Sequence, residues 1–78
     1  METKNRNSYL GALEILTPRE IEILKFVEKG HTNKEIAGKL YLSERTVHAH
    51  RRSLHEKLNI RGRNGLIKWL YRIRNEKQ

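Results

Sequence analysis

Apolar and polar residues follow a helical spacing over most of the chain, most clearly from residue 43 to residue 58. At about 100° per residue, Val47, Leu54 and Leu58 fall on one narrow stripe, which predicts a helix that packs on a core along that stripe. The opposite arc carries hydrogen-bond donors and one small apolar residue, namely Arg45, His48, Ala49 and Arg52. This mixture suits the base edges of a DNA major groove, although it would also keep a surface helix soluble.

Two earlier helices begin with the same capping signal. Thr17 stands three residues before Glu20, with proline at the first helical position, and residues 32–35 repeat the Thr and Glu spacing. Gly30 supplies a stop between the two helices. The second helix is short and is followed by a tight turn at residues 41–42, after which Ser43 opens the basic helix. Residues 33–58 therefore have the pattern of a helix-turn-helix.

A basic turn at residues 59–64 leads into a fourth helix, capped by Asn64. Its apolar face is wider than a small core should need, so we expect part of it to be covered by a second subunit. The residues expected to make that dimer contact are Leu66, Trp69, Leu70 and Ile73. The alternative is that Trp69 covers the core or packs against the N-terminal segment.

Residues 1–15 carry few organising signals, so we expect a mobile N-terminal segment that becomes ordered towards Leu16. The alternative is a short extra helix from about Ser8 to Glu14. Residues 16–78 are predicted to form a single all-α, four-helix domain that contains the helix-turn-helix.

The formal net charge of +8 is concentrated on and after the basic helix. Residues 1–42 hold seven Lys and Arg against six Glu, whereas residues 43–78 hold ten against three. An excess of this kind attracts phosphate groups. No run of residues is apolar enough to span a membrane, and the N-terminus lacks the pattern of a signal peptide. We therefore expect a soluble, cytoplasmic protein.

Catalytic and metal chemistry find little support in the sequence. The chain contains neither Asp nor Cys, and it has no glycine-rich phosphate loop. His48 and His50 point to different sides of their helix, and no two histidines stand four residues apart as in helical metal sites. We expect neither an enzyme, a metal site nor a cofactor.

Three further polar residues are candidate phosphate ligands. Asn33 and Lys34 begin the second helix, where backbone N–H groups and the helix dipole favour an anion. Arg51 stands beside the core stripe of the basic helix, so its stem can pack while its guanidinium reaches a phosphate.

Several motifs now coincide at fixed spacing: Leu16-Thr17-x-Arg19-Glu20, Asn33-Lys34-Glu35-Ile36-Ala37, Leu40-x-Leu42-Ser43, Thr46-Val47-x-x-His50, Lys57-Leu58 and Arg63. From Leu16 to about Ile73 the chain resembles the LuxR/GerE-type helix-turn-helix, the output domain of NarL/FixJ response regulators. The resemblance implies a four-helix domain whose third helix enters the major groove and whose fourth helix often mediates dimerisation.

Carried over by position, the resemblance implies that His48, Ala49 and Arg52 approach the bases. It implies contacts with the DNA backbone by Lys34, Ser43, Thr46, Arg61 and Arg63, and it assigns His50 to packing or phosphate contact and Glu20 to a structural role.

The sequence as a whole predicts a transcription regulator that binds double-stranded DNA as a homodimer on a site of two halves. RNA polymerase is a further candidate partner, and a membrane is not expected. Two alternatives stay open at this point: a sigma-like helix-turn-helix module of an initiation factor, and a basic amphipathic module that binds a membrane or a protein. The chain is either a small stand-alone regulator or the output end of a longer protein.

Overall fold

The computed structural model describes residues 8–62 and 64–76, and every regular element in these residues is an α-helix. The all-α class is therefore confirmed, and so is the helix-turn-helix. Five helices are present instead of the expected four, because the N-terminal stretch forms the extra helix that the sequence left open; residues 1–7 lie outside the described residues. The helices are α1 (Tyr9–Ile15), α2 (Pro18–Glu28), α3 (Asn33–Leu40), α4 (Glu44–Leu58) and α5 (Gly65–Glu76).

The predicted helix starts of α2 and α3 are both confirmed as capping boxes. The Thr17 hydroxyl accepts a hydrogen bond from the Glu20 N–H at 3.1 Å, and the Glu20 carboxylate accepts one from the Thr17 N–H at 2.9 Å. Thr32 and Glu35 make the same reciprocal pair at 3.1 Å and 2.9 Å. Gly30 follows the end of α2 with φ +87°, a conformation that favours glycine. Local sequence thus fixes where α2 begins and ends and where α3 begins.

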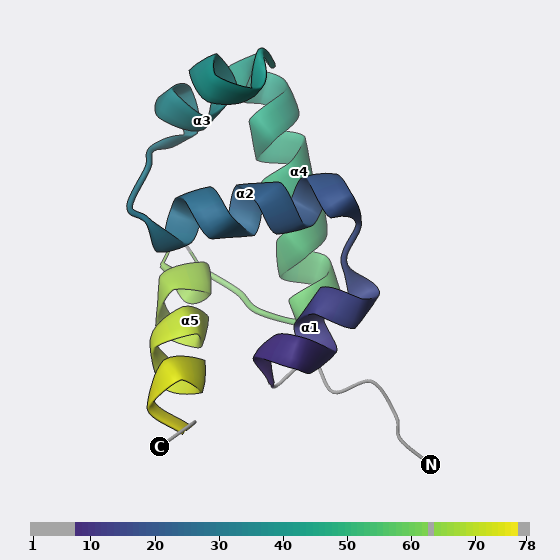
Figure 1. Cartoon of the computed structure of the whole chain (residues 1–78), viewed down its shortest axis with the longest axis vertical. Helices are drawn as coiled ribbons and strands as arrows, with labels where there is room; N and C mark the ends of the chain where they lie inside the picture. The colour runs from purple at the N-terminus through teal and green to yellow at the C-terminus, as the bar shows by residue number, and fades with distance from the viewer. Residues whose placement is uncertain (1–7, 63, 77–78) are drawn as a thin grey trace.

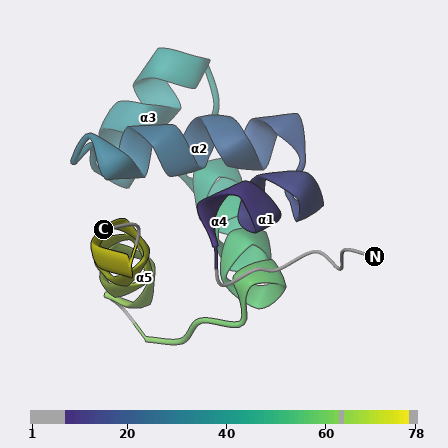
Figure 2. The ribbon, with the colours of Figure 1, turned by 60° about the horizontal axis from the view of Figure 1, so that its bottom comes forward.

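Helix α2 lies across α4, and α3 packs beside the N-terminal half of α4 (Figure 1). Helix α5 contacts α2, and α1 lies near the C-terminal half of α4 in both views of the ribbon (Figures 1 and 2). No helix of the described ranges is long and apolar enough to cross a membrane. This arrangement leaves one long side of α4 without a covering helix.

The core lies where the helices meet and holds side chains from all five helices or their ends. The predicted stripe of α4 is buried, with Val47 and Leu54 at 0% exposure and Leu58 at 2%. Helix α1 adds Ala12, which is fully buried, and the following Leu16 is also buried. The remaining buried apolar residues are Ile23, Leu24, Val27, Ile36, Ala37, Leu66, Trp69, Leu70 and Ile73.

The expectation for the apolar face of α5 has to be corrected. Leu66 and Trp69 are at most 1% exposed, and Leu70 and Ile73 are also buried within the single chain. These four side chains are therefore not a free surface for a second subunit, and Trp69 packs in the core, as the alternative held. The face is covered because α2 contacts α5 and because Tyr9 of α1 packs against the buried cluster to which these side chains belong.

Candidate nucleic-acid interface

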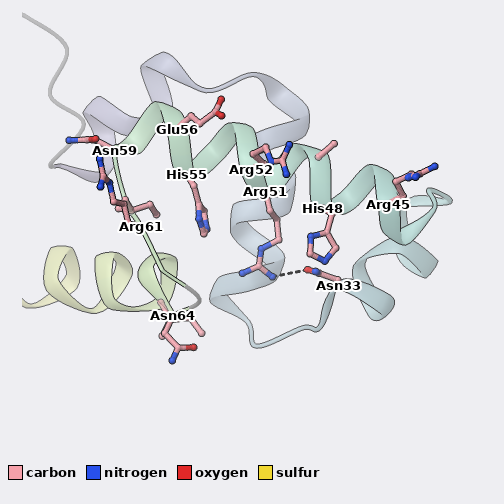
Figure 3. A pocket seen from close by; sticks show the side chains of 13 residues that line it. Asn33, Arg45, His48, Arg51, Arg52, His55, Glu56, Asn59, Arg61 and Asn64 are labelled. Atoms are coloured by element: carbon pink, nitrogen blue, oxygen red, sulfur yellow. Dashed lines mark hydrogen bonds between the residues drawn. The ribbon is translucent and has the colours of Figure 1, made fainter.

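The uncovered side of α4 forms one wall of an open groove of about 1170 Å³. The groove runs between the start of α3, at Asn33, and the start of α5, at Asn64 (Figure 3). Helix α4 is continuous from Glu44 to Leu58, so all its side chains keep a fixed angular relation to the buried stripe. Whatever enters the groove must therefore meet one particular face of this helix.

An outer row of side chains occupies that face, and we use this name for Arg45, Ala49, Arg52 and Glu56. Their spacing of three or four residues places them one above another along α4. All four residues are exposed and line the groove. Arg45 and Arg52 extend away from the body of the protein instead of packing on it (Figure 3). The three outer-row residues that the sequence singled out as base-contacting therefore lie together and are accessible.

An inner row lies beside the outer row and consists of His48, Arg51 and His55. In Figure 3 these three side chains point from α4 into the space between Asn33 and Asn64. His48 is exposed, whereas Arg51 and His55 are half-buried. The fourth predicted base-contacting residue, His48, is thus accessible from the groove but stands deeper in it than the outer row.

The turn between α3 and α4 sets the direction in which α4 leaves the body. Tyr41 adopts the left-handed conformation, with φ 57° and ψ 42°, and the N–H of Leu42 donates to the Ala37 carbonyl at 2.9 Å. The Ser43 hydroxyl then caps α4 by accepting from the Thr46 N–H at 3.1 Å, and it donates to the Thr46 hydroxyl at 3.0 Å. The Tyr41 side chain is 95% exposed and makes no contribution to the core.

The predicted phosphate-contacting residues fall into two groups. Lys34, Ser43 and Arg61 are exposed, so a DNA backbone can reach them. The other three described residues are half-buried, namely Asn33, Thr46 and Arg51. Arg63 lies outside the described residues. The first group is the more accessible source of phosphate contacts, because its residues are more exposed.

Arg51 and Asn33 are partners of each other, which the sequence did not suggest. The Arg51 Nη1 atom donates a hydrogen bond to the Asn33 Oδ1 atom at 2.7 Å (Figure 3). Burial lowers the pKa of the Arg51 guanidinium, yet an arginine keeps its charge at any ordinary pH. The bond ties α4 to the first residue of α3.

Glu20 is the functional neighbour that sequence reasoning saw only in part. Besides capping α2, its carboxylate accepts hydrogen bonds from the Ser53 hydroxyl and, at 2.9 Å, from Lys57 Nζ of α4. Burial raises the pKa of Glu20, but the hydrogen bonds from Ser53, Thr17 and Lys57 outweigh it, and the net effect is a lowered pKa. Glu20 thus holds α4 by its inner side and keeps Lys57 engaged away from the groove.

His55 has an unusual environment on the floor of the groove. Its Nε2 atom is buried and has no hydrogen-bond partner among the described residues. Burial lowers the pKa of His55, and the nearby charge of Arg51 lowers it further. The ring is therefore held in its neutral form more firmly than a solvated histidine.

The charge of the groove is strongly positive. Arg45, Arg51, Arg52 and Arg61 line it, and of the described lining residues only Glu56 carries a carboxylate. Within residues 8–62 and 64–76, no group of His, Cys, Asp or Glu is arranged to hold a metal ion. The arrangement suits a long, anionic ligand better than a small molecule, because the groove is open along its length.

Comparison with known proteins agrees with this chemistry. The family described as "Bacterial regulatory proteins, luxR family" (GerE) matches residues 14–70. The oxygen regulatory protein NreC of Staphylococcus carnosus (strain TM300) is 41% identical over 66 residues, which are 85% of this chain and 30% of that protein. The NreC proteins of Staphylococcus epidermidis (strain RP62A) and Staphylococcus aureus (strain JH9) are 38% identical over 68 residues and 43% identical over 56 residues.

The Staphylococcus epidermidis match covers 87% of this chain and 31% of that protein, and the Staphylococcus aureus match covers 72% and 26%. The chain thus spans less than a third of the length of these curated relatives. No solved structure gives a significant match.

Proposed function

This chain belongs to the luxR family of bacterial regulatory proteins, whose members are DNA-binding transcription regulators, and from that premise we propose that it reads double-stranded DNA through α4. One observation carries the proposal. Arg45, His48, Ala49 and Arg52 are all accessible along one groove, while the opposite stripe of the same helix is buried in the core. An α-helix presented in this way fits the major groove of B-DNA.

Each of these side chains has a base edge that it can recognise. Arg45 and Arg52 can donate two hydrogen bonds to O6 and N7 of guanine, and Ala49 can contact the methyl group of thymine. His48 can donate to a base acceptor or to a phosphate from its deeper position. Base recognition is thereby assigned to residues that are exposed and form no part of the core.

The DNA backbone is proposed to contact the two ends of the groove. Lys34 and Ser43 stand at the α3 side and the turn, and Arg61 stands on the loop before α5, so the contacts would hold α4 in register with the bases. We assign Thr46 and Arg63 to the same set, together with Asn33 and Arg51 at the α3 end of the groove. These contacts carry no sequence information themselves, but they supply most of the affinity.

A symmetric dimer remains part of the proposal, with a corrected surface. Two large apolar side chains are exposed on α5: Ile67, at 56%, lines the groove, whereas Tyr71, at 68%, does not. A second copy packed against the Tyr71 side of α5 would place two α4 helices on two half-sites, about one helical turn of DNA apart. Pairing through Tyr71 leaves the buried residues of α5 in place.

Selection of bound duplexes from a random-sequence DNA pool tests the proposal directly. We expect an enriched palindromic sequence, because a two-fold dimer reads the same half-site twice. Affinity for the selected duplex should fall steeply as salt rises, since phosphate contacts release counterions. A pool that stays random, or an affinity that is flat with salt, would contradict the proposal.

A further inference from the structure

The hydrogen bond between Arg51 and Asn33 spans the groove at its α3 end. Nη1 of Arg51 lies 2.7 Å from Oδ1 of Asn33, and the two residues belong to α4 and to the first turn of α3. Both are half-buried and both line the groove. The contact is therefore shielded in part from solvent but stands where a ligand of the groove would pass.

The chemistry of the two side chains fixes which way the Asn33 amide points. A guanidinium has donors and no acceptor, so it can bond only the oxygen of the amide. With Oδ1 held by Arg51, the Nδ2 atom with its two hydrogens must face the other way. Asn33 and His48 both line the groove at its α3 end, where Figure 3 shows the Asn33 amide bonded to Arg51.

Arg51 has no carboxylate partner at ion-pair distance among the described residues, and its guanidinium donates a hydrogen bond to the Asn33 amide. A hydrogen bond from a charged donor is shorter and stronger than one between neutral groups. The bond to Asn33 is thus suited to hold the amide in one orientation against rotation about its last torsion.

We propose that Arg51 is a positioning residue, which orients the Asn33 amide so that Nδ2 donates a hydrogen bond to one phosphate of the bound DNA. Arg51 then acts through Asn33 and is not itself the ligand of that phosphate. This inference rests on the proposed function, because it assumes a duplex in the groove. The phosphate contact at the α3 end of the groove is thereby assigned to the neutral Asn33 amide, which Arg51 aligns.

The test uses the selected duplex with single phosphates replaced one at a time by neutral methylphosphonates. The unchanged protein should lose affinity at a set of positions, each marking one contacted phosphate. Asn33→Ala and Arg51→Met should each weaken binding about three- to tenfold, the size of one hydrogen bond. Both variants should become insensitive to replacement of the same phosphate, and the double variant should bind no worse than the weaker single variant.

A matched control removes an arginine elsewhere. Arg72 is exposed on α5 and does not line the groove, so Arg72→Met should leave the pattern of sensitive phosphates unchanged. Melting curves followed by circular dichroism show whether each variant is folded. If the Arg51–Asn33 hydrogen bond had only a structural role, its loss would lower the melting temperature, but binding would stay sensitive to replacement of every contacted phosphate.

Three outcomes would overturn the inference. Arg51→Met could abolish the sensitivity of binding to replacement of one phosphate while Asn33→Ala leaves that sensitivity intact, which would make Arg51 a phosphate ligand in its own right. The affinity losses of the two single variants could add up in the double variant. Alternatively, both variants could stay sensitive to replacement of every phosphate that the unchanged protein contacts. If the unchanged protein enriched no duplex at all, the proposed function would fail with it, and that result is distinct from the other three.

Discussion

Lys57 of α4 and Glu20 of α2 form an ion pair with Nζ and Oε1 2.9 Å apart. The Glu20 side chain is only 5% exposed, and it also accepts hydrogen bonds from Ser53 and from the Thr17 backbone. One carboxylate therefore both starts α2 and fixes the inner side of α4. This attachment and the buried apolar stripe both act on the side of α4 opposite Arg45 and Arg52.

Glu20→Ala should destabilise the domain by about 2 to 4 kcal/mol, because it removes a helix cap and leaves Lys57 and Ser53 without their partner. Chemical denaturation measures this as a lower midpoint with an unchanged slope. Glu22→Ala is the matched control on the same helix. Its pair with Arg19 is exposed, so the change should cost no more than about 0.5 kcal/mol. Equal losses of unfolding free energy in the two variants would show that the buried contacts of Glu20 stabilise the domain no more than an exposed ion pair does.

Tyr41→Asn should raise stability by about 0.5 to 1 kcal/mol, although no contact is added. Tyr41 has φ 57°, a conformation that asparagine tolerates better than tyrosine, and its side chain is 95% exposed, so removing it loses no packing. Thermal unfolding measures the gain. Tyr41→Val should have the opposite sign, since a β-branched residue is strained at positive φ. A loss of stability in the asparagine variant would mean that the ring has a structural contact of its own.

Local signals predicted the helices of this fold well. Thr17 and Thr32 each cap a helix within three residues of sequence, and the stripe of α4 needs only the helical period, so these features follow from neighbours along the chain. The same reasoning placed the base-contacting candidates on one accessible face, where the structure also has them; their contact with bases stays a prediction.

Contacts between distant residues were beyond such reasoning. Ser53 and Lys57 reach Glu20 across 33 and 37 residues, and Arg51 reaches Asn33 across 18, and no periodic pattern reports these pairs. The burial of the apolar face of α5 also depends on contacts between distant segments. With α1 and α2 in place, Trp69 and its neighbours are buried within the single chain, as the alternative for Trp69 predicts.

Acidification should destabilise the protein through His55. Its pKa is lowered in the folded state by burial and by Arg51, so the unfolded chain binds a proton more readily than the folded one. Stability is therefore undiminished above the unfolded pKa of about 6.5 and falls as the pH drops through that value towards the lower folded pKa.

His55→Leu should remove this part of the pH dependence, because leucine does not titrate. Melting temperatures between about pH 7.5 and pH 5.5 measure it, over the range in which histidine titrates. The variant should also be at least as stable at the upper end, since the buried Nε2 atom without a partner is gone. The same fall in both proteins would contradict the role given to His55.

Arg52→Ala and Arg61→Ala should weaken DNA binding in different ways. Arg52 belongs to the outer row, so its loss should cost about 1 to 3 kcal/mol on the selected duplex and relax the preference at one base position. Arg61 is assigned to the backbone, so its loss should weaken all sequences alike and reduce the salt slope by about 1. Repeated selection with each variant and salt titrations measure both. Equal losses on selected and random DNA for the two variants would contradict the division of roles.

Tyr71→Glu should impair pairing on DNA while leaving the domain folded. The side chain is 68% exposed on α5 and does not line the groove, so a carboxylate there disturbs neither the core nor the DNA contacts of one subunit. On a duplex with two half-sites, the variant should bind as independent single subunits, with lower affinity than the unchanged protein. On a duplex with one half-site the two proteins should bind alike. Gel-shift titrations and sedimentation analysis separate these cases.

Trp69→Ala provides the contrast, because Trp69 is buried in the core of the single chain. Its truncation should cost about 3 to 5 kcal/mol and unfold much of a domain this small, whatever DNA is present. If Tyr71→Glu left cooperative binding to paired half-sites intact, the exposed side of α5 would not be the contact between subunits. If instead Trp69→Ala stayed as stable as the unchanged protein and lost only pairing, Trp69 would be part of the contact between subunits.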